Sequence, residues 1–307
     1  MTINWALVQR HPALQARARI LQSLRQFFID RDYLEVETPQ RIPAPAPETH
    51  IEAIPADGWF LHTSPELCLK RLLAAGYPRL FQVSHCWRKD ERGRQHLPEF
   101  TILEWYCTGQ DYHHLMTMCE ELLSHLACAT GAGTRLGYQG KIIDLTPPWP
   151  RITVREAFAG HSRLSMEEAL RKDVFDEILV SDVEPHLISD RPVFLCDYPA
   201  ERGALARLSA DDPTVAERFE LYIGGLELAN AFSELVDVDE QRERFLREEA
   251  CRRHIGRTPY PLADKFLNEL THMPPAAGIA LGVDRLVMLL LDKAAIDEVV
   301  AFTPEEL

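Results

Sequence analysis

Hydrophobic and polar positions along the chain follow two periods, one typical of helices and one typical of strands. Apolar residues recur every three or four positions in the first predicted helix, at Leu14, Ala18, Leu21, Leu24 and Phe28. Alternation with period 2 predicts strands, of which two are joined by a charged loop between Phe81 and Tyr106. Helices are predicted at residues 12–31, 65–75 and 111–130 and within 151–190. Strands are predicted at 33–37 and 193–198, as a pair with its loop within 81–106, and as a second pair on both sides of Gly224-Gly225.

The second strand of the first hairpin carries polar chemistry on one face. Four of its side chains point the same way because side chains alternate across a strand: Phe100, Ile102, Glu104 and Tyr106. An unpaired buried carboxylate is costly, so this face suits a pocket for a flat ring and a cationic amine better than a core. Arg88 and His96 flank the connecting loop and could contact phosphate oxygens. The alternative interpretation is an ordinary hairpin with a solvated face.

A second hairpin is predicted around Gly224-Gly225, because a glycine pair supplies the positive φ angles of a tight turn. With these glycines as the loop, Tyr222 pairs with Glu227, and one face carries Glu220, Tyr222, Glu227 and Ala229. Two carboxylates on neighbouring strands repel each other unless a cation lies between them. Mg²⁺ together with a polyphosphate would satisfy this requirement. The alternative is a pair of exposed glutamates on a solvent face.

A glycine-containing segment, Gly278-Ile-Ala-Leu-Gly282-Val-Asp-Arg285, precedes the last apolar helix. Glycines let the backbone approach a ligand closely, and Arg285 in the first helical turn could pair with a terminal phosphate. The chain contains neither Gly-x-x-x-x-Gly-Lys-Ser/Thr nor Gly-x-Gly-x-x-Gly. This excludes nucleotide binding of the Walker and Rossmann types.

Composition and charge narrow the class of protein. The 307 residues are 46% apolar, enough for one large domain or two modest ones. The net charge of −14 disfavours a general nucleic-acid binder, and the arginines of residues 242–257 are interpreted as a solvated helix face. The seven scattered cysteines form no Cys-x-x-Cys, and no signal peptide or membrane-length apolar run is present. A soluble, cytoplasmic protein without a membrane partner is expected.

Three ordered segments resemble motifs 1, 2 and 3 of the class II aminoacyl-tRNA synthetases, at about residues 15–39, 80–106 and 278–292. Within this class, four phrases resemble the lysine subgroup: SPELCLKRLL, HLPEFTILEWY, ERFELYIGGLELANAFSEL and ALGVDRLVML. The resemblance covers essentially the whole chain. It implies one α+β catalytic domain over residues 1–307, with an antiparallel β-sheet flanked by helices. It also implies a homodimer, because motif 1 builds the dimer interface in this class.

Motif 1 begins near residue 15, so no anticodon-reading OB fold is expected before it, and the chain resembles the stand-alone enzymes that attach (R)-β-lysine to elongation factor P. This resemblance implies activation of (R)-β-lysine or lysine with ATP and Mg²⁺, then transfer to a lysine side chain of elongation factor P. One alternative is a truncated lysyl-tRNA synthetase with tRNA or another amine as acceptor; the missing domain and the acidic charge disfavour tRNA. Another is a catalytically silent, amino-acid-sensing paralogue.

The resemblance also implies roles for individual residues. The implied ATP-binding set is Arg88, Lys89, Asp90, His96, Leu97, Phe100, Glu220, Glu227, Leu228, Gly282 and Arg285. Within it, Arg88 and Arg285 are the catalytic residues, Phe100 stacks under adenine, and Glu220 and Glu227 hold Mg²⁺. The implied lysine-binding set is Ser64, Pro65, Glu66, Glu104, Tyr106, Asn230, Glu234 and Ala280. In this set Glu66 takes one amino group, whereas Glu104, Tyr106 and Glu234 surround the distal ammonium.

Two features depart from the pattern of the tRNA enzymes. Motif 2 usually reads Arg-x-Glu, but here Asp90 is one methylene shorter, and Glu91 could replace it only if the loop bends early. Ser64 and Ala280 stand where the tRNA enzymes have Ala and Gly. Both residues resemble the elongation factor modifier, and an extra methyl beside the substrate's α-carbon could favour a β-amino acid.

Overall fold

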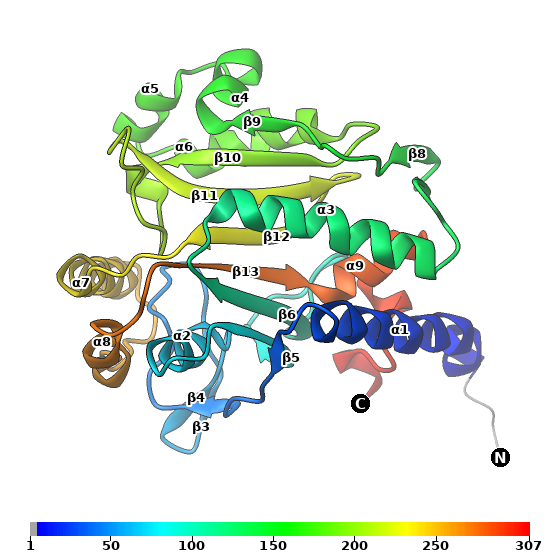
Figure 1. Cartoon of the computed structure of the whole chain (residues 1–307), viewed down its shortest axis with the longest axis horizontal. Coiled ribbons are helices and arrows are strands. Elements are labelled where there is room, and N and C mark those ends of the chain that lie inside the picture. The colour runs from blue at the N-terminus through cyan, green and yellow to red at the C-terminus, as the bar shows by residue number, and fades with distance from the viewer. Residues whose placement is uncertain (1–4) are drawn as a thin grey trace.

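An eight-stranded β-sheet forms the centre of the computed structural model, which describes residues 5–307 (Figure 1). From edge to edge its strands are β1 (Leu34–Glu35), β5 (Arg79–Trp87), β6 (Glu99–Thr108), β13 (Ala276–Gly282), β12 (Leu226–Ser233), β11 (Val215–Ile223), β10 (Val193–Pro199) and β9 (Arg151–Thr153). The six central strands are antiparallel, whereas each edge strand runs parallel to its neighbour. The predicted α+β class is therefore confirmed, and the sheet is mixed only at its edges.

Helices α1 (Trp5–Ile29) and α3 (Tyr112–Ala129) lie across one face of this sheet (Figure 1). Apolar side chains on the inner faces of these helices, such as Leu24, Phe28 and Leu122, are completely buried in the main core together with Trp105 of β6. Asp111 caps α3 by accepting a hydrogen bond from the His114 backbone N–H at 3.1 Å. The helix predicted at 12–31 is confirmed, and it begins about two turns earlier, at Trp5, and ends at Ile29.

The remaining elements surround the sheet. The other helices are α2 (Glu66–Ala74), α4 (Val154–His161), α5 (Met166–Arg171), α6 (Phe175–Ile178), α7 (Val238–His254), α8 (Asp264–Leu270) and α9 (Val283–Leu290). Short helical turns are η1 (Leu179–Val183), η2 (Glu184–Leu187), η3 (Ala200–Arg202), η4 (Ile296–Glu298) and η5 (Pro304–Glu306). Two small sheets contain β2 (Arg41–Ile42), β3 (Pro55–Ala56) and β4 (Trp59–Leu61), and β7 (Arg135–Tyr138) and β8 (Lys141–Asp144).

Residues 151–190 were predicted to be charged and helical. Residues 151–153 instead form the edge strand β9, and the helices α4 to η2 follow beside this edge of the sheet (Figure 1). Thr153 and Ser165 each form a capping box with the glutamate three residues later, which fixes where α4 and α5 begin. Phe158 and Phe175 stack with their ring centroids 5.0 Å apart and lie in a separate small core against β10. This segment therefore has its own packing on the edge of the sheet.

The Gly224-Gly225 hairpin has the predicted pairing at its turn, with Tyr222 opposite Glu227. A β-bulge then inserts Leu228, so that Leu221 pairs with Ala229 and Glu220 pairs with Asn230. The prediction that Ala229 shares the face of Glu220 is wrong, because Ala229 and Leu221 both lie in the apolar core. The bulge instead places Asn230 on the same face as Glu220.

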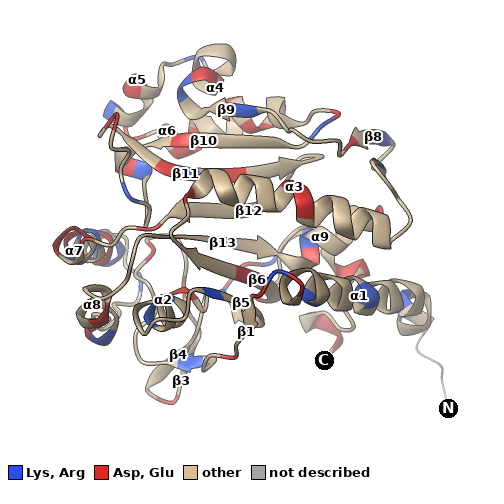
Figure 2. Ribbon diagram, viewed as in Figure 1, with Lys and Arg blue, Asp and Glu red and all other residues tan. Residues whose placement is uncertain are grey.

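Helix α7 carries a dense mixture of charges, whereas the central strands are mostly uncharged (Figure 2). The interpretation of its arginines as a solvated face is wrong for two of them. Arg252 is completely buried and donates to Glu52 Oε2 at 2.6 Å and to two backbone carbonyls of the loop before β3. Arg244 is also buried and donates to the carbonyls of Ala204 and Ala206, each at 2.8 Å. These arginines attach α7 to the proline-rich loop and to the segment after η3.

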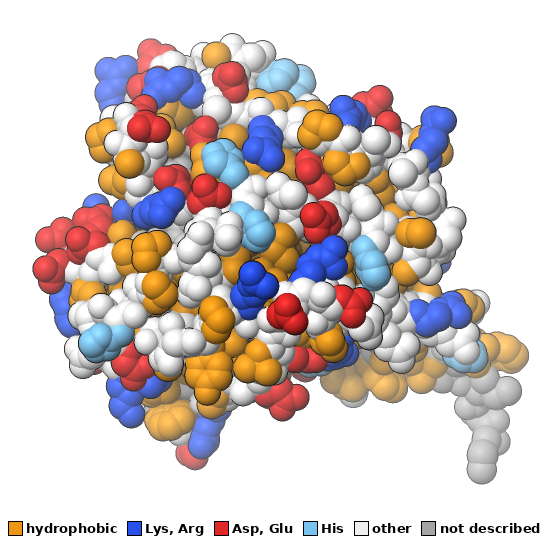
Figure 3. Space-filling model, viewed as in Figure 1, with side chains coloured by type: hydrophobic (Ala, Val, Ile, Leu, Met, Phe, Trp, Pro, Cys, Tyr) orange, Lys and Arg blue, Asp and Glu red, His pale blue; other side chains and the backbone are white. Residues whose placement is uncertain are grey.

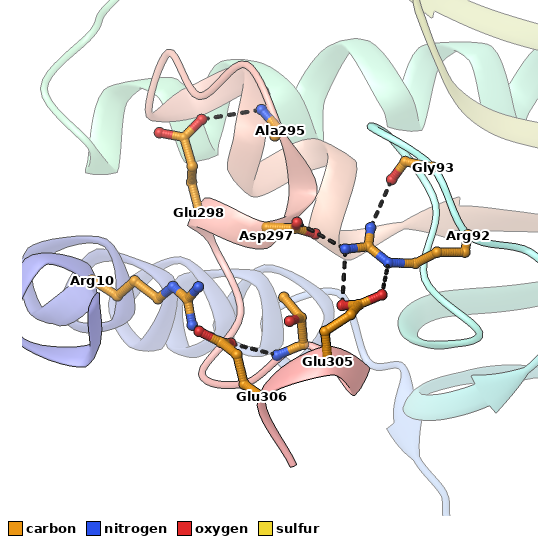
Figure 4. Close-up of polar contacts among 9 residues, drawn as sticks. Arg10, Arg92, Gly93, Ala295, Asp297, Glu298, Glu305 and Glu306 are labelled. Atoms are coloured by element: carbon orange, nitrogen blue, oxygen red, sulfur yellow. Dashed lines mark hydrogen bonds and ion pairs between the residues drawn. The ribbon is translucent and has the colours of Figure 1, made fainter. Parts of the chain in front are cut away.

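The C-terminal turn η5 is held to the β5–β6 loop and to α1 by ion pairs (Figure 4). Arg92 binds both carboxylate oxygens of Glu305, at 2.8 and 3.1 Å, and Asp297 Oδ2 at 2.9 Å. Arg10 of α1 donates to Glu306 Oε2 at 2.6 Å. Three parts of the chain that are distant in sequence are thereby joined beside the loop of the first hairpin.

Acidic, basic and apolar side chains are interspersed over the face of the molecule that carries α1 and α3 (Figure 3). None of the helices within residues 5–307 is long and apolar enough to cross a membrane.

Candidate active site

The face of the sheet opposite α1 and α3 forms the floor of a cavity of about 1610 Å³. Alternation along β6 separates the two environments, because Leu103 and Trp105 lie in the core between the sheet and the helices. The intervening side chains line the cavity: Phe100, Ile102, Glu104 and Tyr106. The predicted sorting of polar and apolar side chains along this strand is confirmed.

Glu104 is the central carboxylate on this floor and is completely buried. It accepts hydrogen bonds from Ser64 Oγ at 2.5 Å and from Tyr106 Oη at 2.8 Å. Burial, together with the neighbouring Glu66 carboxylate, raises the pKa of Glu104 to about 8. Because burial and the neighbouring carboxylate disfavour the ionised form of Glu104, a cationic group that enters the cavity would stabilise it.

Glu234, the residue directly after β12, is also buried, with 1% of its surface exposed. Its Oε2 is 2.5 Å from Lys70 Nζ, whereas its Oε1 has no hydrogen-bond partner in the described chain. Burial raises the pKa of Glu234 to about 8. Gly278 of β13 leaves room for this arrangement, since a Cβ atom there would lie 2.1 Å from Tyr106 Cε1 and 2.2 Å from Glu234 Oε1. The unpaired buried oxygen fits an ammonium group of a ligand.

Glu220 and Glu227 lie on neighbouring strands at another part of the same cavity. Glu220 accepts from Arg218 Nη2 at 2.5 Å and from Tyr222 Oη at 2.8 Å. The Glu227 side chain remains 44% open to the cavity, and its partial removal from bulk water together with Glu220 raises its pKa. Mutual repulsion of this kind favours binding of a divalent cation between the two carboxylates.

Two carboxylates, Glu220 and Glu227, are too few to form a metal site from protein ligands alone. Within residues 5–307, no cluster of three or more His, Cys, Asp and Glu side chains could hold a metal ion. Mg²⁺ commonly binds through one or two carboxylates and takes its other ligands from substrate phosphates and water. The Glu220–Glu227 pair fits this mode of binding and does not fit a metal site built from protein ligands alone.

Arg285 points from the start of α9 across the cavity to the β5–β6 loop. Its Nη1 donates to the Glu227 carbonyl at 2.7 Å, and its Nε donates to the Gln95 carbonyl at 3.2 Å. Its Nη2 lies 2.5 Å from His96 Nε2. Burial and the Arg285 charge lower the pKa of His96, so the neutral imidazole accepts this hydrogen bond. Arg285 is thus a fixed cation that connects motif 3 to the motif 2 loop.

Arg88 provides a second cation at the end of β5. Its Cζ lies 5.1 Å from the centre of the Phe100 ring, and its buried Nε has no hydrogen-bond partner among the described residues. An unsatisfied guanidinium nitrogen in a cavity is suited to a phosphate or carboxylate oxygen. Arg88 also lies 3.8 Å from the carboxylate of Glu91.

Most of the predicted site residues are brought together by the fold. The cavity is lined by Ser64, Glu66, Arg88, His96, Leu97, Phe100, Glu104, Tyr106, Glu220, Glu227, Leu228, Asn230, Ala280, Gly282 and Arg285. Of the others, Pro65 is the residue before α2, and Glu234 lies beneath the floor beside Gly278.

Lys89 and Asp90 are exposed and lie outside the cavity lining. Asp90 has a φ of 66°, and this left-handed conformation turns the chain immediately after β5. The early bend brings Glu91 into the cavity lining beside Arg88. The structure therefore places Glu91, and neither Lys89 nor Asp90, among the side chains that line the cavity beside Arg88.

Several groups of the site were not predicted. Arg218 could have been found from its period-2 spacing to Glu220, and Lys70 from its i+4 spacing to Glu66 on α2. Glu48, on the proline-rich loop, lines the cavity. Burial raises the pKa of Glu48, and the positive charge of the neighbouring Arg88 offsets part of this rise. No local pattern in the sequence indicates that this loop reaches the site.

The sequence matches the family model of class II tRNA synthetases (D, K and N) over residues 6–306. The chain belongs to this family. The segments that resemble motifs 1, 2 and 3 fall on α1 and β1, on β5, β6 and their loop, and on β13 and α9. Asp284 joins the three motifs, because it accepts from the Thr101 N–H at 2.7 Å and pairs with Arg17 Nη1 at 2.6 Å.

Class II relatives of two kinds are similar to the chain. The lysine–tRNA ligase of Pelotomaculum thermopropionicum is 38% identical over 94% of this chain, which spans 62% of that enzyme's length. The elongation factor P–(R)-β-lysine ligase of Edwardsiella ictaluri is 40% identical over 94% of both chains. That of Vibrio parahaemolyticus is 38% identical over 98% of both chains.

Proposed function

We propose that this protein is an ATP-dependent amino-acid ligase that activates (R)-β-lysine, or lysine, as its adenylate and transfers it to a lysine side chain of elongation factor P. The observation that carries the proposal is one cavity that combines two arginines and a carboxylate pair with a separate group of buried carboxylates. The arginines and the carboxylate pair suit a nucleoside triphosphate with its metal ion, and the buried carboxylates suit a substrate with ammonium groups. The name of the enzymes from Edwardsiella ictaluri and Vibrio parahaemolyticus supports the acceptor.

In the activation step, an oxygen of the amino-acid carboxylate attacks the α-phosphorus of ATP, and the bond to pyrophosphate breaks. Arg88 would hold the α-phosphate, Arg285 would hold the far end of the triphosphate, and Phe100 would stack on adenine. Glu220 and Glu227 would hold Mg²⁺, which neutralises phosphate charge when bound. No protein nucleophile is required, because positioning and charge neutralisation lower the barrier.

In the transfer step, the acceptor amine attacks the carbonyl carbon of the adenylate, the bond to AMP breaks, and the amine loses a proton. The new amide bond joins the amino acid to the protein. Asn230 and Glu66 would hold the amino acid through both steps, with Glu104, Tyr106 and Glu234 at the distal ammonium.

The preference for the β-amino acid is a finer proposal. Ala280 lies between Asn230 and Glu104 in the sheet register and lines the cavity. Ser64 donates to Glu104 and so engages one of its oxygens. An added methyl in a pocket is worth about 10- to 100-fold in discrimination, so Ala280→Gly is expected to weaken any preference for the β isomer by this order.

A homodimer and a cytoplasmic location complete the proposal. Motif 1 forms the dimer interface in class II enzymes, and here α1 has exposed apolar side chains such as Trp5 and Val8. All seven cysteines are free thiols, a usage typical of reducing compartments.

The deciding experiment is the intact mass of elongation factor P after incubation with this protein, Mg²⁺, ATP and either (R)-β-lysine or lysine. We expect a gain of one lysyl unit, faster with the β isomer. Glu227→Gln should abolish the gain, whereas the exposed Glu167→Gln on α5 should leave it unchanged.

Two other results would redirect the proposal. Formation of a lysyl-adenylate without modification of elongation factor P would favour tRNA or another amine as acceptor, in line with the similarity to lysine–tRNA ligases. Failure to form any adenylate would support a catalytically silent paralogue.

A further inference from the structure

Lys70 is a buried cation that the steps described above do not use. It lies on α2 one turn after Glu66, and none of its side chain is exposed. Its Nζ is 2.5 Å from Glu66 Oε1 and 2.5 Å from Glu234 Oε2. Two carboxylates that were predicted to hold different amino groups of the substrate thus share one ammonium group of the protein.

The surroundings of Lys70 keep it charged. Burial alone would lower the pKa of Lys70, but the Glu234 and Glu66 carboxylates outweigh burial and raise it above its ordinary value. The other titratable groups facing this cluster are Glu104 and Tyr106 from β6 and Glu48 from the proline-rich loop. Lys70 is therefore a permanent positive charge among acidic groups.

The charges of the cluster match those of a diammonium substrate. Glu66, Glu104 and Glu234 carry three negative charges when ionised, and Lys70 carries one positive charge, which leaves two negative charges. Lysine and β-lysine each bring two ammonium groups. Each carboxylate that contacts Lys70 also has a second oxygen, and in Glu234 this Oε1 is buried without a partner in the described chain.

We propose that Lys70 is a positioning residue that pairs with Glu66 and Glu234 at once, holds both side chains in orientation and favours the ionised form of Glu234, so that the site selects a substrate with two ammonium groups. This inference rests on the proposed function of the cavity. Without the Lys70 charge, the carboxylates of Glu66 and Glu234, which both lie next to the position of its Nζ atom, repel each other, and one of them takes up a proton. A neutral carboxyl group cannot neutralise an ammonium group, so substrate binding then competes with protonation.

The direct test is Lys70→Met in lysine-dependent exchange of pyrophosphate with ATP, measured from pH 6 to pH 9. We expect kcat/KM for lysine to fall about tenfold or more at pH 7, mainly through KM, because Lys70 does not touch the reacting atoms. The acid limb of the pH profile should move up by about one pH unit, a tenfold change in proton affinity. The matched control is Lys172→Met, an exposed lysine after α5, which should behave like the wild type.

A second comparison does not depend on catalysis. Lys70→Met should lower the Tm of the ligand-free protein by an amount that grows from pH 6 to pH 9, since the unpaired carboxylates ionise over this range. Adding Glu66→Gln removes the repulsion, so the double variant should regain Tm at pH 9. In a double-mutant cycle the two substitutions are then strongly non-additive.

Different failures have different meanings. A Tm loss that is independent of pH and unaffected by Glu66→Gln would overturn the inference, because Lys70 would then only fill space. A pH profile of Lys70→Met parallel to that of the wild type would overturn it as well. If the wild type itself shows no lysine-dependent exchange, the proposed function fails, and the Tm comparison still decides whether the Lys70 charge offsets the repulsion between Glu66 and Glu234.

Discussion

At the scale of single residues, the two most deeply buried carboxylates of the proposed lysine site have an unusual affinity for protons. The pKa values of Glu104 and Glu234 are raised from 4.5 to about 8, chiefly by burial. The folded protein therefore binds more protons than the unfolded chain between about pH 4.5 and pH 8. By linkage, the free energy of unfolding contributed by these groups falls as the pH rises through this window.

Lysine binding should therefore release protons near neutral pH. The ligand's ammonium groups stabilise the ionised carboxylates, so affinity should increase between pH 6 and about pH 8. Calorimetric titration at pH 7 in two buffers of different ionisation enthalpy measures the number of protons released. Glu104→Gln should reduce that number. Equal heats in both buffers would contradict the predicted protonation of the free site.

Gly278 is the residue at which the smallest substitution should have the largest effect. A Cβ atom there would lie about 2 Å from Tyr106 and Glu234, far inside contact distance. We expect Gly278→Ala to displace both side chains, to destabilise the fold by about 1–3 kcal/mol as overpacking does, and to raise the KM for lysine more than that for ATP. Gly160→Ala in α4 is the control, because its Cβ would meet no atom within 4 Å. Unchanged lysine binding in Gly278→Ala would refute the assignment of this pocket.

At the scale of elements, the motif 2 loop is held from outside the site by the C-terminal segment (Figure 4). Arg92 pairs with Glu305 and Asp297, and Arg94 Nε donates to the Ala294 carbonyl at 2.8 Å. The same loop connects Arg88 to His96. We expect these contacts to keep Arg88 and His96, the two side chains proposed to face phosphate, in position relative to each other.

Arg92→Ala should loosen this loop. We expect a severalfold increase in the KM for ATP, little change in the KM for lysine, and only a small change in Tm because exposed ion pairs add little stability. Steady-state exchange kinetics with each substrate varied in turn measure the two effects. Arg163→Ala removes another exposed ion pair, in the α4–η2 segment, and should alter neither KM. An equal rise in both KM values would count against a specific role of the loop.

At the scale of the whole molecule, the proposed dimer can be checked directly. The chain has a mass of 35.0 kDa, and sedimentation should give twice this value if α1 and its motif 1 partner β1 meet those of a second copy. Replacing the exposed Trp5 and Val8 with serine should weaken the association. A protein that sediments as a monomer at micromolar concentration while catalysing exchange would contradict the dimer.

Much of the site could be predicted because its residues follow local patterns. Period-2 alternation predicted that Phe100, Glu104 and Tyr106 face one cavity, since the two sides of a strand see different environments. The Gly224-Gly225 turn predicted the pairing of Tyr222 with Glu227. The same rule failed at Ala229, because a bulge shifts the register and leaves no reliable trace in the residues around it.

The sequence by itself determined the main helices, the two central hairpins, their order and the family, because periodicity and motif spacing depend on neighbouring residues along the chain. Only the tertiary structure decided which charges meet. Lys70 reaches Glu234 on a distant strand, Asp90 turns away so that Glu91 enters the cavity, and Arg252 is buried under the proline-rich loop. Such pairs depend on how helices and strands pack together, since burial makes an unpaired charge costly and so selects the contacts that neutralise it.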